Sequence, residues 1–199
     1  MPASEKQIQN MKQKRATILE QALRLFSEYG YYDTTIQKVA KASKVSFGSV
    51  FTYFENKEAL FHAVVAEPLQ EREAEILDFQ TDPEHPMEEI ERMVRDHLYQ
   101  FAKMGIYLRL IQQIIGQPST FAKEYSLLRQ FHKNLVQRLA LLIQKGQEKG
   151  QLRASDAEKT AITYTSFLIG LRLNITNEPD HPVWEQFAPC AVQIFGPIR

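Results

Sequence analysis

Side chains that could bond to or stack against a partner are concentrated between Ser46 and Lys57. The hydroxyl groups in this segment can donate hydrogen bonds to phosphate oxygens, and serine is a residue type that caps the start of a helix. The ring of Phe47 can contact thymine methyl groups, and Lys57 adds a positive charge. Gly48 costs about 1 kcal/mol relative to alanine inside a helix, but it permits close approach to another backbone. This chemistry suits a nucleic-acid partner.

Two short helices and a tight turn are expected to position these side chains. The second helix should span 46–54, with 43–45 as the turn before it and Asn56 capping the next helix. The buried faces are predicted to be Ile36, Val39 and Ala40 in the first helix and Val50 and Phe54 in the second. The order is typical of a helix-turn-helix, whose second helix enters the DNA major groove.

The segment from Thr34 to Phe61, TTIQKVAKASKVSFGSVFTYFENKEALF, closely resembles the N-terminal domain of the TetR (tetracycline-repressor) family. The resemblance rests on the Thr-Thr pair, the Val-Ser at the turn exit and the closing Tyr-Phe-x-Asn-Lys-Glu-Ala-Leu. It covers about the first sixty residues. It implies DNA contacts at Thr35, Gln37, Ser46, Phe47, Gly48, Ser49, Phe51, Thr52, Tyr53 and Lys57.

Three positions depart from the family pattern. Phe47 stands where lysine is frequent, which weakens a phosphate contact there. Phe51 stands where tyrosine is common, so a hydroxyl contact is lost and a packing role becomes an alternative. Lys44 stands where glycine is common, and a lysine there is expected to strain the backbone. These departures bear on the operator sequence and leave the expected fold unchanged.

The composition favours a soluble globular protein with one basic end. Of the 199 residues, 44% are apolar and 24% are charged. No stretch approaches the roughly 20 apolar residues that span a bilayer, and no apolar signal core is present, so a cytoplasmic location without membrane contact is expected. Residues 1–62 carry nine Lys or Arg against six Asp or Glu, while residues 63–199 carry fifteen against eighteen. The net charges are therefore +3 for the first segment and −3 for the second. This difference suits attraction of the N-terminal segment alone to phosphates.

The apolar spacing predicts an all-α fold of about nine helices. No segment shows the alternation of a strand. Residues 1–11 are expected to be disordered, Pro68 should kink or end its helix, and Ser155 with Glu158 should form a capping box. Helices are expected at 12–29, in a short segment before the turn, at 46–54, from 57 onward, and at 87–104, 106–115, 120–149, 155–174 and 183–195. Cys190 is expected to be a small buried packing residue.

The expected domains are a helix-turn-helix domain at 1–62 and an effector-binding and dimerisation domain at 63–199. The family resemblance implies that the later helices enclose an effector pocket and that the last two form a dimer interface. The residues expected to line the pocket are His97, Phe101, Met104, Tyr107, Arg109, Gln113, Phe121, Tyr125, His132, Tyr164 and Phe167. Taken singly, each is better explained as a core residue or an extended surface side chain than as part of a ligand site.

These features predict a homodimeric, ligand-responsive transcription repressor that binds a palindromic operator and is released by an apolar or aromatic small molecule. The alternative is a DNA-binding protein of the same fold that is controlled by a partner protein or has no small-molecule ligand. An enzyme is not expected, because the chain has no nucleophile elbow, phosphate loop or dinucleotide fingerprint. No cofactor or metal is expected either, because the five histidines lack ligand-like spacing.

Overall fold

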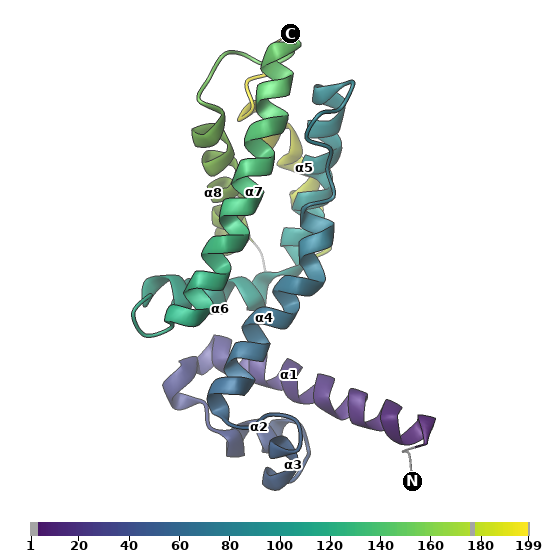
Figure 1. Cartoon of the computed structure of the whole chain (residues 1–199), viewed down its shortest axis with the longest axis vertical. Coiled ribbons are helices and arrows are strands. Elements are labelled where there is room, and N and C mark those ends of the chain that lie inside the picture. The colour runs from purple at the N-terminus through teal and green to yellow at the C-terminus, as the bar shows by residue number, and fades with distance from the viewer. Residues whose placement is uncertain (1–3, 176–177, 199) are drawn as a thin grey trace. The chain divides into compact units, whose positions relative to one another are not determined.

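The computed structural model describes residues 4–175 and 178–198, and within them the fold is all-α (Figure 1). Apart from one isolated bridge between Leu152 and Pro197, the described part of the chain contains no β-structure. The helices are α1 (Glu5–Asp33), α2 (Ile36–Ala42), α3 (Phe47–Phe51), α4 (Lys57–Ile76), α5 (Pro86–Lys103), α6 (Gly105–Gly116), α7 (Ala122–Glu148), α8 (Ala157–Asn174), α9 (Val183–Gln186) and α10 (Ala188–Gln193). The all-α prediction is confirmed. Counting the short α9 and α10 as the one expected last helix gives the nine predicted.

The chain folds as two compact units. The first contains the described residues up to Leu69 together with Arg109–Glu124, and the second contains Gln70–Leu108 and the described residues from Tyr125 onward. These units do not coincide with the expected boundary between residues 62 and 63. Most of α6 and the first residues of α7 group with the helix-turn-helix segment. Among the described residues, no helix is both long enough and apolar enough to cross a membrane.

The core of the first unit is built from α1, whose Ile18, Ala22 and Phe26 recur every four residues and are fully buried. The ring of Phe26 meets Phe61 of α4 edge-on, with centroids 5.0 Å apart. Gly30 has φ +78°, a conformation that glycine adopts without strain, and it breaks the helix locally while helical structure continues to Asp33.

The start of α1 corrects one expectation. Residues 5–11, expected to be disordered, are helical. The Ser4 side chain accepts a hydrogen bond from the Gln7 backbone amide, and the Gln7 side chain accepts one from the Ser4 amide. This reciprocal capping box satisfies two helix-end donors and lets the helix begin at Glu5.

Pro68 lies inside α4, and the helix continues past it to Ile76, so the proline does not end the helix. Two further expectations are wrong in detail. The N-cap of α8 is Asp156, whose side chain accepts from the Lys159 amide, whereas the Ser155 hydroxyl bonds instead to Thr160 and Gln147. Cys190 is exposed.

In the second unit, α5 packs against α8, α9 and α10. The centre of this packing is a buried pair, His97 of α5 and Tyr164 of α8, with the Phe195 ring 4.8 Å from that of Tyr164. Gly105 begins α6 directly under Arg172 of α8. A Cβ at that position would overlap the Arg172 guanidinium, so a larger residue would force the end of the Arg172 side chain to shift.

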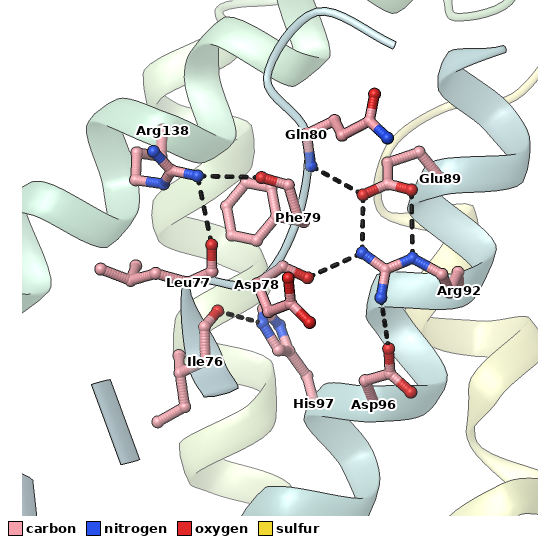
Figure 2. A network of polar contacts seen from close by, with 10 residues as sticks. All are labelled: Ile76, Leu77, Asp78, Phe79, Gln80, Glu89, Arg92, Asp96, His97 and Arg138. Atoms are coloured by element: carbon pink, nitrogen blue, oxygen red, sulfur yellow. Dashed lines mark hydrogen bonds and ion pairs between the residues drawn. The ribbon is translucent and has the colours of Figure 1, made fainter. Parts of the chain in front are cut away.

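The C-terminal end of α4 is held by side chains from α5 and α7 (Figure 2). The last carbonyls of a helix have no partner within the helix. Here Arg138 of α7 donates from Nη2 to the carbonyls of Leu77 and Phe79, at 3.1 and 2.9 Å. Arg92 of α5 donates to the Asp78 carbonyl at 2.7 Å. Cations therefore lie beside the negative end of the helix dipole and bind carbonyls of the segment that follows α4.

Arg92 is itself fixed by carboxylates on its own helix. Its Nη2 donates to Glu89 at 2.7 Å and its Nη1 to Asp96 at 2.8 Å. Glu89 also accepts the backbone amide of Gln80 at 2.7 Å (Figure 2). The hydrogen bond from Arg92 is the main reason why the pKa of Glu89 is lowered from its ordinary value. The network thus ties the segment after α4 to the first turns of α5.

We expect Arg138→Ala to lower the free energy of unfolding by about 2 kcal/mol, because two carbonyls lose a charged donor. Urea titration followed by circular dichroism measures the change. The matched control is Arg129→Ala on the same helix, whose guanidinium lies over an aromatic ring 5.9 Å away and is exposed. Equal destabilisation by the two variants would contradict a special role for Arg138.

Candidate DNA-binding surface

The helix-turn-helix is formed by α2 and α3, and α3 has one buried and one exposed side. Ser46 caps α3 by accepting the Ser49 amide at 3.2 Å, as its residue type predicts. Val50 is fully buried and Phe54 is 5% exposed, so they attach the helix to its unit. Phe47 lies on the other side. The expected second helix of 46–54 is shorter than predicted, because regular helix ends at Phe51.

The turn between the two helices contains a strained residue. Lys44 has φ +55° and is the one non-glycine residue with a positive φ among those described. Such a conformation costs roughly 1 kcal/mol in an L-residue. The strain expected from a lysine at this position is confirmed. The turn is closed by the Val45 amide, which donates to the Ala40 carbonyl at 3.0 Å.

The outer face of α3 carries two aromatic rings. Phe47 is 55% exposed and Phe51 is 43% exposed, so the packing role considered for Phe51 is not what the structure has. Their ring centroids lie 5.1 Å apart at an interplanar angle of 70°. A Cβ added at Gly48 would meet nothing within 4 Å, and Thr52 is exposed beside the rings. An open apolar face on a short helix is typical of a binding surface.

The flanking polar residues lie at helix starts. Thr35 caps α2 by accepting the Lys38 amide at 3.2 Å, and Gln37, the second residue of α2, is exposed. Asn56 caps α4 by accepting the Ala59 amide at 2.7 Å, as expected. The Thr35 cap uses the side-chain oxygen as an acceptor only. The Thr35 hydroxyl hydrogen can therefore still be donated to a phosphate oxygen.

Lys57 is less free than the sequence indicates. Its ammonium lies 4.2 Å from the centre of the Tyr31 ring and 3.5 Å from the Tyr32 carbonyl. Partial burial lowers the pKa of Lys57 from its ordinary value, against the opposite influence of Glu58. The side chain is therefore held against the protein in a defined position at the start of α4.

Beside Lys57, an aromatic and acidic cluster joins the start of α4 to the start of α7. The Tyr31 hydroxyl donates to Glu58 at 2.8 Å, and burial, with help from this bond, raises the pKa of Tyr31 to about 12. His62 Nδ1 lies 2.9 Å from the Glu124 carboxylate. A small cavity of about 130 Å³ lies between Tyr31 and Glu124. This cluster explains why the first residues of α7 belong to the first unit.

The residues expected to line an effector pocket do not all belong to one unit. Arg109, Gln113 and Phe121 lie in the first unit. Gln113 donates from its amide to the Ser27 carbonyl at 3.0 Å, and the Phe121 ring lies tilted against that of Phe61, with centroids 5.1 Å apart. Arg109 is exposed. These three side chains therefore belong to the first unit and do not line a pocket in the second.

The second unit holds the other eight, and it brings His97 and Tyr164 together. His97 Nε2 donates to the Ile76 carbonyl at 2.8 Å, so Nδ1 accepts the Tyr164 hydroxyl at 3.0 Å. Both ring nitrogens are satisfied, and burial lowers the pKa of His97 to about 4. His132 bonds to the Thr165 hydroxyl at 3.1 Å. Phe101, Met104 and Tyr107 are buried, whereas Tyr125 and Phe167 are half-buried.

Sequence reasoning missed a cavity of about 460 Å³ in the second unit. It lies between α5 and the segment that leads into α9 and α10. Its walls include apolar and aromatic side chains, with charged groups among them: Arg95, Leu98, Tyr99, Ala102, Pro179, Asp180, His181, Pro182, Trp184, Glu185 and Ala188. The one tryptophan of the chain, directly after a proline-rich loop, was the available signal.

Similar proteins of known sequence and structure match over most of the chain. An HTH-type transcriptional regulator of Bacillus subtilis, YhgD, is 27% identical over 85% of this chain and 86% of its own length. A TetR-family regulatory protein from Rhodococcus RHA1 has a TM-score of 0.78 and 19% identity, covering 94% of this chain and 98% of its own. AibR, whose crystal structure was solved with isovaleryl coenzyme A and operator DNA, has a TM-score of 0.73 and 20% identity, covering 93% and 100%.

Residues 18–64 match the family model of the bacterial regulatory proteins of the tetR family. The matched residues contain α2, α3 and the start of α4, which are the elements that build the exposed reading face. Motif, fold and relatives agree: residues 18–64 are a DNA-binding domain of the tetR family type, and the chain is similar over most of its length to TetR-type transcriptional regulators, which are not enzymes.

Proposed function

We propose that the protein is a repressor that binds a palindromic operator as a homodimer and is released by an apolar or aromatic small molecule. The observation that carries the proposal is the exposed face of α3, where Phe47, Phe51 and Thr52 point away from the buried Val50. A helix of this kind inserts into the major groove while flanking residues bind the backbone. Such a regulator would act in the cytoplasm, where the chromosome is.

We assign the DNA contacts by chemistry. Phe47, Phe51 and Thr52 face the bases, and Gly48 lets the helix approach closely. Hydroxyl groups, one amide and one ammonium contact phosphates, namely those of Thr35, Gln37, Ser46, Ser49, Tyr53 and Lys57. The net charge of +3 on residues 1–62 supports this arrangement.

The surface of α8 supports a homodimer. Apolar residues of this helix are not confined to one face, whereas a surface helix normally buries a single apolar stripe. Ile162 is 41% exposed, and Phe167 is only half-buried beside Phe187, with ring centroids 6.3 Å apart. Ile194 is also half-buried. A second copy of α8 and the last helices would cover these residues. The α3 helices of the two subunits would then each bind one half-site of the operator.

The cavity of about 460 Å³ supports the small-molecule arm of the proposal. Its volume falls within the range of sites for drug-sized ligands, and the Tyr99 and Trp184 rings suit an apolar or aromatic compound. AibR was crystallised with an acyl coenzyme A and with operator DNA, which makes a carboxylic thioester a useful probe. The competing function, control by a partner protein, would leave this cavity without a ligand.

A panel of apolar and aromatic compounds, with isovaleryl coenzyme A added as a separate thioester probe, should contain one compound that stabilises the free protein and weakens operator binding about tenfold. Ala188→Trp, which fills the cavity from its wall, should abolish both effects and keep operator binding. Leu141→Trp, at an exposed site on α7, is the matched control. A compound that still releases DNA from the Ala188→Trp variant would place the effector elsewhere. A panel without any hit would favour the partner-controlled alternative.

A further inference from the structure

The recognition helix lacks every side chain that reads bases through paired hydrogen bonds. Guanine is read mainly by Arg or Lys, adenine by Asn or Gln, and cytosine by Asp or Glu. The segment 46–54, Ser-Phe-Gly-Ser-Val-Phe-Thr-Tyr-Phe, contains none of these six residue types. Its discrimination between bases must therefore come from apolar contact and single hydroxyl groups.

The apolar group that the major groove offers is the C5-methyl of thymine. On the protein side, Phe47 and Phe51 are one turn apart on α3 and are the two large apolar side chains on its open face. Their centroids are 5.1 Å apart, whereas base pairs in a duplex follow one another by about 3.4 Å. The two rings together thus cover two neighbouring base pairs. The open space at Gly48 lets this face come close to the groove floor.

We propose that Phe47 and Phe51 specify the operator by contacting the C5-methyl groups of thymines at two neighbouring base pairs in each half-site. The proposal rests on the major-groove position of α3 given above. Thr52 adds a methyl and a hydroxyl at the end of the same face. Hydrogen bonds to base edges would then come from residues that flank the helix, such as Lys44, which is exposed in the turn before α3.

The test begins with selection of operator duplexes from a random library by the full chain. Each thymine of the selected half-site is then replaced by deoxyuridine, which differs only in lacking the C5-methyl. We expect two neighbouring positions at which affinity falls about fourfold per methyl, the effect of exposing one buried methylene-sized group. Replacing a sensitive T·A pair by 5-methylcytosine·G should retain more affinity than replacing it by C·G.

Variants assign the rings. Phe47→Ala should remove the uracil sensitivity at one of the two positions, and Phe51→Ala at the other, because a ring that is absent cannot sense the methyl. Both side chains are exposed, so the variants should melt as the parent does. Ile115→Ala on α6 removes a side chain that is 51% exposed in the same unit, and it should leave the uracil profile unchanged.

Three outcomes would overturn the inference. One is a selected operator with G·C at the positions that Phe47 and Phe51 control. Another is a combination of two results: the fully uracil-substituted duplex binds with full affinity, and Phe47→Ala still weakens binding. This combination would mean that the rings contact sugar and phosphate and not the thymine methyl groups. The third is unchanged binding by both variants, which would point to a protein partner for the rings. Failure to select any sequence would instead contradict the operator-binding function itself.

Discussion

Replacing Phe187 or Ile194 with aspartate should produce monomers that bind operator DNA at least about a hundredfold more weakly. Both residues are half-buried in the single chain and lie in or beside the last short helices. A charge there would have to be desolvated in a paired interface, whereas in a monomer it stays hydrated. Once the two heads are no longer linked, the gain from effective concentration, typically 10²–10⁴, is lost. Sedimentation velocity and fluorescence anisotropy with the selected operator measure the two effects.

The matched control for the dimer is Leu141→Asp, which places the same charge at a leucine that is 53% exposed on α7. It should remain dimeric and bind DNA normally. Thermal melting separates loss of pairing from loss of folding, because a monomer that binds weakly but melts cooperatively is still folded. If both aspartate variants sediment as dimers, the interface is elsewhere on the molecule.

Acidification from pH 7 to pH 5 should cost about 2 kcal/mol of unfolding free energy through His97 alone. Burial lowers the pKa of His97 to about 4 in the folded protein, from about 6.5 when it is exposed. Below pH 6.5 the unfolded chain gains a proton that the folded chain does not take up. The unfolded state is therefore favoured as the pH falls, until about pH 4, where both states are protonated. Above pH 7 the contribution is constant.

Urea titrations of the parent and of His97→Gln at pH 5, 6 and 7 measure this effect. Glutamine can still donate to the Ile76 carbonyl but does not titrate, so the variant should be less stable at pH 7 yet lose less stability on acidification. His85→Gln, which changes an exposed histidine, should behave as the parent does. The groups that face His97 are Tyr164, Asp96 and Arg92. If the unfolding free energy of His97→Gln fell with pH as steeply as that of the parent, the pH dependence would not come from His97.

The helix-turn-helix was predictable because its determinants are local. Cap residues such as Ser46 and Asn56 and the buried pair Val50 and Phe54 all act within one or two helical turns of sequence. The helical start at Glu5 was equally local. Its Ser4 and Gln7 form a recognisable capping box, so that signal was present in the sequence and outweighs the polar composition.

The pocket residues were less predictable because their roles depend on contacts between distant parts of the chain. His97 is a satisfied core histidine only because the carbonyl of Ile76 and the hydroxyl of Tyr164, 21 and 67 residues away, converge on it. Periodicity places His97 on an apolar face but cannot supply these partners. The same holds for Gln113, whose bond to Ser27 spans 86 residues. The contact of each expected DNA-binding residue with DNA stays a prediction.

The stretches of sequence that form the first unit determine which residues must be exchanged together when chimeric regulators are made. This unit is assembled from two stretches of sequence, because Phe121 and Glu124 complete the packing around Phe61 and His62. A chimera that transplants residues 1–62 alone would expose an aromatic ring and separate a carboxylate from its histidine. A chimera that preserves the first unit must include Arg109–Glu124 as well. Otherwise the recipient protein must have matching side chains at the corresponding positions. An exchange of the first unit between regulators therefore has to include two segments of sequence.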